Sequence, residues 1–100
     1  MSIGMIVDFK FKPDSQGAAL MTKTLKDRLP SVTRTFDGCE FVRLYVDPDD
    51  PNHLFLLERW ESRAKYEKYR EWAMAQPGSD DMMSMVESEP TWTYLDDTGA

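Results

Sequence analysis

The sequence has little of the two residue types that most often bind metals or act as nucleophiles: one cysteine, Cys39, and one histidine, His53. A single cysteine excludes an intrachain disulfide. A single histidine without an acidic cluster at ligand spacing does not make a metal site, so we predict no metal and an exposed loop position for His53. Cys39 follows a turn and has no histidine nearby to activate it, which indicates an ordinary strand residue.

Basic charge and long hydrophobic runs are also lacking. Twelve lysines and arginines stand against 18 aspartates and glutamates, giving a formal charge of −6 without a basic stripe. This argues against nucleic acid and anionic membranes as partners. No apolar stretch approaches the ~20 residues that cross a bilayer, and the N-terminus lacks the features of a signal peptide. We therefore expect a soluble, cytoplasmic protein.

Apolar and aromatic residues are abundant for a chain of 100 residues. They make up 41% of the sequence, with three tryptophans, four tyrosines, five phenylalanines and seven methionines. The length predicts one domain over residues 1–100, with a core at about 3–95 and a loose tail at 96–100. A chain this short buries only about 60–65% of its unfolded surface. The apolar content therefore indicates either a dense core or burial against another molecule.

Hydrophobic periodicity predicts the order of the elements. Residues 3–11 alternate with period two, which is typical of a strand, and residues 13–15 supply capping oxygens for a helix. An apolar stripe then follows at helical spacing, with a kink or restart expected at Pro30. The members of this stripe are Ala18, Met21, Leu25, Leu29 and Val32.

The second half of the chain predicts a hairpin, two helices and a last strand. Strands over 39–46 and 53–60 flank a polar turn, and Ser62 can cap a helix over 63–75. Residues 79–81 open a short helix over 82–86, and residues 91–95 form the last strand. The order βαββ(αα)β predicts a ferredoxin-like α+β fold, with helices on one face of a four-stranded antiparallel sheet.

The hairpin is apolar on both faces, although helices can cover only one. An antiparallel sheet with a solvated face should alternate apolar and polar residues. Burying about 600 Å² of the second face against another copy contributes about 15 kcal/mol of gross transfer energy, so we predict a homodimer. One face carries Val42, Leu44, Val46, Leu54, Leu56 and Trp60, and the other carries Phe41, Tyr45, Phe55 and Leu57.

The segment from Phe55 to Tyr66, FLLERWESRAKY, resembles the Glu-x-Trp-x-Ser strand-to-helix segment of the antibiotic biosynthesis monooxygenase (ABM) domain family. The likeness covers residues 3–95 and includes FKPD at 11–14, DGC at 37–39, DPD at 47–49 and PTW at 90–92. It implies a dimeric α/β barrel. The family includes quinone-forming monooxygenases, haem-degrading enzymes and quorum-related proteins.

The resemblance also implies site residues. Trp60 and Tyr66 match two of the three residues that face the substrate in polyketide-oxidising members, while Leu56 replaces the third, an Asn. Tyr69 stands where many members have a His. In haem-degrading members the ligating His would fall near Ser79, so haem and other cofactors are not expected here.

Cofactor-free oxygenation requires a base that ionises a phenol or enol, together with a dry pocket. Trp60, through its indole N–H, and Tyr66, through its phenol, are the catalytic candidates, with simple packing as the alternative. We expect Tyr69 and Trp72 to contact the substrate or to pack in the core. Tyr45 and Phe55 complete an aromatic pocket or belong to the dimer face.

Three further residues, Glu58, Asp8 and Met82, each allow a structural or a functional interpretation. Glu58 lies mid-strand between apolar neighbours, where we expect an ion pair with Arg43 or Arg59 rather than a general base. Asp8 is similar, at the open end of the sheet. Met82, in a methionine-rich segment, fills the core or covers a hydrophobic ligand.

The first functional hypothesis is a cofactor-independent monooxygenase that acts with O₂ on a small aromatic or quinol-type substrate. The second is a non-catalytic dimer that binds small hydrophobic or aromatic molecules or is associated with stress. A third is an isomerase or decarboxylase of the related barrel type. One fold hosts many activities, so the site must decide among them.

Overall fold

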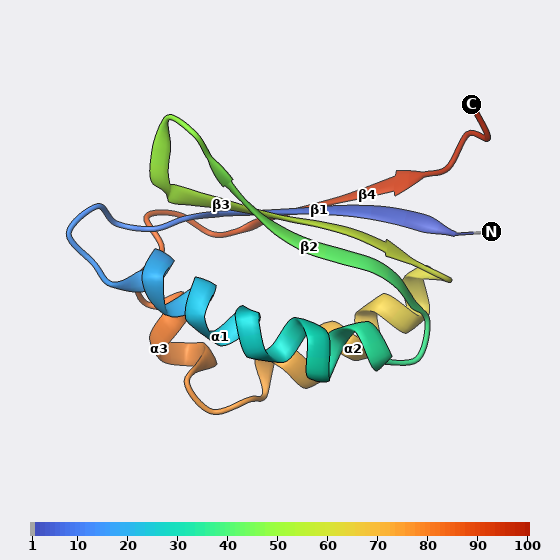
Figure 1. Ribbon diagram of the computed structural model, residues 1–100, viewed down its shortest axis with the longest axis horizontal. Coiled ribbons are helices and arrows are strands. Elements are labelled where there is room, and N and C mark those ends of the chain that lie inside the picture. The colour runs from blue at the N-terminus through green and yellow to red at the C-terminus, as the bar shows by residue number, and fades with distance from the viewer. Residues whose placement is uncertain (1) are drawn as a thin grey trace.

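The computed structural model describes residues 2–100 as one antiparallel sheet with its helices on a single face (Figure 1). The strand order in the sheet is β2-β3-β1-β4. The predicted ferredoxin-like α+β fold is confirmed. The elements are β1 (Ile3–Lys10), α1 (Gly17–Ser31), η1, a 3₁₀ turn (Thr33–Thr35), β2 (Cys39–Asp47), β3 (Asp50–Trp60), α2 (Arg63–Met74), α3 (Ser79–Met83) and β4 (Thr91–Asp96).

Strand β1 lies in the middle of the sheet, antiparallel to both β3 and β4. Its inward side chains, Met5, Val7 and Phe9, are buried, as period-two alternation requires. Phe11 lies one residue beyond the strand, is also buried, and forms an isolated bridge with Val86. The first strand thus supplies much of the floor against which the helices pack.

Helix α1 begins at Gly17, whose backbone N–H donates to Ser15 Oγ at 3.3 Å, so one of residues 13–15 supplies an oxygen as expected, although the Gln16 side chain at the N-cap position makes no hydrogen bond. A Cβ at Gly17 would lie 2.2 Å from the Phe11 ring, so only glycine permits this close approach. The predicted stripe is buried at Met21, Leu25 and Leu29. The helix continues through Pro30 and is followed by the 3₁₀ turn.

Helix α2 begins where the sequence predicts, because Ser62 Oγ accepts a hydrogen bond from the Lys65 backbone N–H at 3.2 Å. Tyr66 and Tyr69 are buried on its inner side. Helix α3 starts at Ser79 and ends at Met83, so the residues expected to open it are themselves its first turn.

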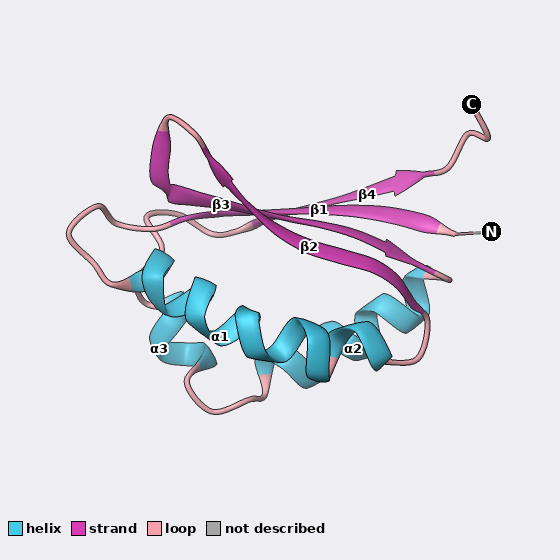
Figure 2. Cartoon of the chain, in the orientation of Figure 1, coloured by secondary structure: helices cyan, strands magenta, loops and turns pink. Residues whose placement is uncertain are grey.

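The two faces of the sheet are covered unequally. Figure 2 shows all the helices below the sheet and no element above it. On the hairpin, Val42, Leu54 and Trp60 face the helices and are buried, as expected. The opposite face, called the outer face below, carries the apolar residues Ile6, Phe41, Tyr45, Phe55, Leu57 and Leu95, and between them the polar residues Asp8, Arg43, His53, Arg59, Thr91 and Thr93. Among residues 2–100 no helix has the length and apolarity to cross a membrane.

Candidate functional site

A cavity of about 220 Å³ lies between the inner face of the sheet and the helices. Apolar side chains from β1, β3, β4, α1, α2 and α3 make most of its wall, and a few polar groups interrupt them. Small-molecule sites have this character. The lining residues include Val7, Phe9, Met21, Leu25, Leu56, Tyr66, Tyr69, Ala73, Met82, Met83 and Trp92, together with the charged residues Arg28, Glu58 and Arg70.

Glu58 is the buried charged group of this cavity, with a relative exposure of 6%. It lies on β3 between Leu56 and Trp60 on the inner face. Its Oε1 accepts a hydrogen bond from the Trp60 indole N–H at 3.0 Å. Burial raises the pKa of the Glu58 carboxyl to about 7, and the Trp60 N–H partly opposes this rise. The carboxyl therefore exchanges a proton near neutral pH.

The expected ion pair of Glu58 with Arg43 or Arg59 is wrong. Successive strand residues point to opposite faces, so Arg59 lies on the outer face, away from Glu58. Arg59 pairs instead with Glu40 at 3.3 Å and Asp97 at 2.7 Å. The alternation of a strand would have predicted this, because Leu56, Glu58 and Trp60 lie on one face and Arg59 on the other.

Of the two residues predicted to be catalytic, Tyr66 lines the cavity and Trp60 lies behind its wall. Trp60 is fully buried, and its ring lies 5.7 Å from Tyr66 and 5.2 Å from Tyr69 between ring centroids. Its indole N–H donates to Glu58, which lines the cavity, and does not itself line it. Burial raises the pKa of the Tyr66 phenol well above its ordinary value, so this hydroxyl stays protonated at neutral pH.

The residues predicted to contact substrate divide into two groups. Tyr69 and Met82 line the cavity, and the Tyr69 hydroxyl lies 2.8 Å from the Thr33 hydroxyl. Burial raises the pKa of the Tyr69 phenol as well. Trp72 packs nearby, with its ring centroid 5.9 Å from that of Tyr69, but outside the cavity wall.

Tyr45 and Phe55 lie on the outer face, opposite each other in the β2–β3 register. They are separated from the cavity by the sheet. The structure therefore places Tyr66, Tyr69 and Met82 in the wall of the same cavity as Glu58, and it leaves Tyr45 and Phe55 on a different surface.

Two arginines of the cavity were not identified from the sequence. Arg28 extends from α1 and Arg70 from α2, and both are half-buried. The Arg70 guanidinium carbon lies 4.0 Å from the centroid of the Trp92 ring. The position of Arg70 next to the inward-facing Tyr69 indicated that it lies near the buried side of α2. Helical periodicity does not show how far a long side chain extends, so its place in the cavity wall could not be predicted.

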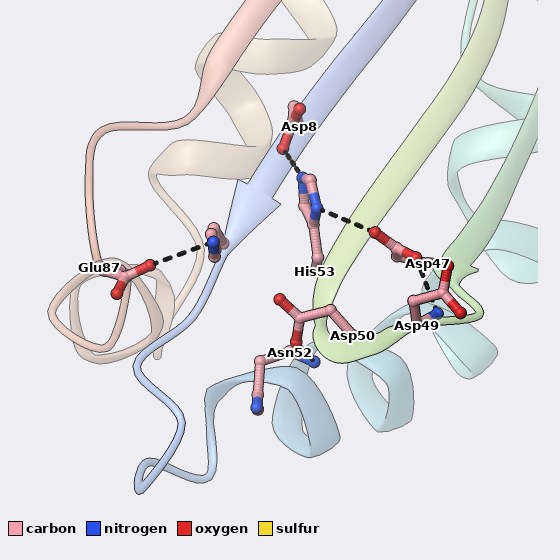
Figure 3. Close-up of polar contacts among 8 residues, drawn as sticks. Asp8, Asp47, Asp49, Asp50, Asn52, His53 and Glu87 are labelled. Atoms are coloured by element: carbon pink, nitrogen blue, oxygen red, sulfur yellow. Dashed lines mark hydrogen bonds and ion pairs between the residues drawn. The ribbon is translucent and has the colours of Figure 1, made fainter.

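His53 is a strand residue rather than an exposed loop residue, which corrects the prediction. Its ring lies on the outer side of β3 between two carboxylates, as Figure 3 shows. Nε2 is 2.5 Å from Asp8 Oδ1, and Nδ1 is 3.5 Å from Asp47 Oδ2. His53, Asp8 and Asp47 thus connect β3, β1 and β2 at the hairpin end of the sheet. Within residues 2–100 no cluster of acidic, histidine or cysteine side chains is arranged to hold a metal ion.

Cys39 is the first residue of β2 and is half-buried. Burial, with the nearby Glu58 carboxyl, raises the pKa of its thiol to about 11. The thiol is therefore protonated at neutral pH and unsuited to act as a nucleophile, in agreement with its interpretation as an ordinary strand residue.

Comparison with known proteins identifies the family. The family model for antibiotic biosynthesis monooxygenase matches residues 2–76, three quarters of the chain. The chain belongs to the antibiotic biosynthesis monooxygenase family. The ABM resemblance inferred from residues 55–66 is thereby confirmed. A search of curated proteins finds no match.

Solved structures agree with this assignment. Rv0793 of Mycobacterium tuberculosis is 25% identical, with a TM-score of 0.70 over 97% of this chain and 95% of that chain. A crystal structure of an antibiotic biosynthesis monooxygenase is 22% identical, with a TM-score of 0.72 over 96% and 98%. PA3566 of Pseudomonas aeruginosa is 16% identical, with a TM-score of 0.74 over 96% and 93%. The last two matches show the fold alone.

Proposed function

We propose that this ABM protein is a cofactor-independent monooxygenase that oxidises a small phenolic or quinol-type substrate with O₂. One observation carries the proposal: a buried carboxyl, Glu58, faces an otherwise mainly apolar cavity and has a pKa of about 7. Strongly perturbed ionisable groups in cavities are candidates for acid–base catalysis. Family membership supports the reaction class.

The first step requires a base that works at neutral pH. A neutral phenol transfers an electron to O₂ far less readily than its anion does. A base is most effective when its pKa is near the working pH, because it is then ionised and still accepts a proton. With a pKa of about 7, Glu58 meets both conditions, whereas an exposed glutamate at about 4.3 would be a weaker base.

The reaction then needs no reductant besides the substrate. Glu58 takes the phenolic proton, and the phenolate transfers one electron to O₂. The two radicals combine to form a carbon–oxygen bond, which gives a ring-bound peroxide anion. That carbon then loses its hydrogen as a proton while the O–O bond breaks, and the leaving oxygen takes up both protons as water. A phenol and O₂ thus become a quinone and water, with all four electrons supplied by the substrate.

The surrounding residues have supporting roles in this proposal. Trp60 is a positioning residue, because its N–H orients the Glu58 carboxylate without lining the cavity. Tyr66 lines the cavity as a protonated phenol and can donate a hydrogen bond to a substrate oxygen. The apolar walls limit access of water to the peroxide.

We also propose that the protein acts as a homodimer through the outer face. That face exposes Phe41, Tyr45 and Leu95 at 46%, 46% and 43% of their surface. Exposed apolar side chains on one face, here interrupted by Arg43 and Arg59, support an interface, and a twofold dimer is the commonest symmetry. Pairing of this kind would cover the outer face without obstructing the cavity, which lies on the other side of the sheet.

Oxygen consumption tests the proposed activity. The wild-type protein, Glu58→Gln and the control Glu71→Gln, which alters an exposed carboxylate on α2, are incubated with a panel of hydroquinones. We expect wild type and Glu71→Gln to consume O₂ above the buffer rate, and Glu58→Gln to lose about a hundredfold in rate. Equal rates for wild type and Glu58→Gln would contradict the role of Glu58. Binding without oxygen consumption by any substrate would favour the non-catalytic ligand-binding protein.

A further inference from the structure

The charged groups of the cavity are not balanced. Arg28 from α1 and Arg70 from α2 contribute two guanidiniums, which stay ionised at any physiological pH. The opposing carboxyl of Glu58 is only partly ionised near neutral pH because its pKa is about 7. The cavity is therefore positive overall, although the whole chain carries a formal charge of −6.

Neither cavity arginine forms an ion pair with a carboxylate in the part of the chain that the structure describes. The arginines that do so there, Arg59 and Arg63, lie outside the cavity. Arg28 lies within hydrogen-bond reach of the Tyr69 hydroxyl. The remaining N–H groups of Arg28 and Arg70 have no carboxylate partner there and are available to a ligand.

Aromatic rings hold both guanidiniums in place without neutralising them. The guanidinium carbon of Arg70 lies 4.0 Å from the centroid of the Trp92 ring, and that of Arg28 lies 5.5 Å from the centroid of the Trp72 ring. A guanidinium stacked on a ring keeps the N–H groups at its edge free, which suits recognition of a planar carboxylate.

We propose that the ligand of this cavity is an aromatic carboxylate, whose acid group binds Arg28 and Arg70 and whose phenolic hydroxyl meets Glu58. This inference rests on the proposed function and adds the substrate class. Glu58 is buried and the two arginines are half-buried, so the hydroxyl enters first and the carboxylate stays nearer to solvent. A cavity of about 220 Å³ is below the range of about 300–1,000 Å³ typical of drug-sized ligands, which favours a single substituted ring.

Two probes of nearly the same shape isolate the charge. They are 2,5-dihydroxybenzoate and its neutral amide, 2,5-dihydroxybenzamide, and their dissociation constants are measured anaerobically by calorimetry. We expect the carboxylate to bind about tenfold to a hundredfold more tightly than the amide, as charge-assisted hydrogen bonds allow.

Three variants locate the effect. Arg28→Leu and Arg70→Leu should each remove most of the preference for the carboxylate, and Arg70→Lys should retain part of it. Arg63→Leu is the matched control, because Arg63 also stacks on a ring, with its guanidinium carbon 3.8 Å from the centroid of Tyr94, but lies outside the cavity. It should leave the preference unchanged. Thermal unfolding identifies any variant that fails to fold.

Equal affinity of wild type for the two probes, or an unchanged preference in both leucine variants, would overturn the inference. Such a result leaves the proposed oxygenase intact, because that proposal is tested by oxygen consumption with neutral hydroquinones. Absence of binding by both probes would likewise overturn the assignment of this ligand class.

Discussion

At the scale of single residues, Glu58 determines most of what the cavity can do. The sequence placed it correctly in a strand between apolar neighbours, but the partner expected for it lies on the other face. The alternation of side chains along a strand would have excluded Arg59 as that partner, because Glu58 faces the same way as Trp60. The raised pKa could not be predicted, since it depends on how completely the helices exclude water from the carboxyl.

The raised pKa of Glu58 predicts a pH dependence of stability. The folded state holds the proton up to about pH 7, and the unfolded state holds it only to about 4.5. Stability from this group is therefore fully present below pH 4.5 and is lost as the pH rises through 7. Relative to wild type, Glu58→Gln should gain about 3 kcal/mol in free energy of unfolding between pH 4.5 and 8, as measured by urea denaturation. Glu71→Gln should show no such gain, and a flat difference for Glu58→Gln would refute the pKa shift.

The hydrogen bond from Trp60 to Glu58 predicts how the pH profile of oxygen consumption shifts when the indole is removed. Its N–H stabilises the ionised form of Glu58, so Trp60→Phe should raise the pKa of the carboxyl further. The acidic limb of the pH profile of oxygen consumption should then move above pH 7. Trp72→Phe, which removes an indole outside the cavity wall, should leave that limb in place. A limb that stays near 7 in Trp60→Phe would show that another group titrates.

At the scale of elements, local sequence patterns predicted where helices and strands lie, but not which long side chains reach the cavity. Alternation over residues 3–11 and the apolar stripe of α1 identified both elements, and Ser62 identified the start of α2. The predicted start of helix α3 was three residues too late, because the acidic residues that favour a position before a helix are also favourable within its first turn. Arg28 and Arg70 were missed because their guanidiniums extend from half-buried positions to a cavity formed by distant segments.

The contact of His53 with Asp8 and Asp47 joins β3 to β1 and β2 (Figure 3). His53→Ala should therefore reduce the free energy of unfolding by about 1 kcal/mol, as measured by chemical denaturation. Lys10→Ala provides the control, because Lys10 and Glu87 are half exposed and 3.7 Å apart. It should cost less than about 0.5 kcal/mol. Equal losses in the two variants would mean that the histidine contributes no more than an ordinary surface pair.

At the scale of the whole molecule, the sequence predicted that apolar residues also lie on the sheet face that the helices leave uncovered. The hairpin carries apolar residues on both sides, and the structure places helices on only one of them. What covers the outer face could not be predicted from one chain, because the partner contributes half of the interface.

A charge placed at the centre of the outer face tests the dimer. Leu57→Lys sets like charges near each other across a twofold axis, so it should shift the mass in analytical ultracentrifugation from twice 11.6 kDa to 11.6 kDa. Ala64→Lys adds the same charge to an exposed position on α2 and should leave the dimer intact. A wild-type protein that is monomeric at micromolar concentration would contradict the homodimer.

An anaerobic crystal structure with a small hydroquinone bound would test the role of Glu58 most directly. The ring should lie in the cavity between the sheet and helices α1 and α2, with one hydroxyl within hydrogen-bond distance of a Glu58 carboxyl oxygen. A ring bound on the outer face, or one in the cavity with both hydroxyls turned away from Glu58, would contradict that role.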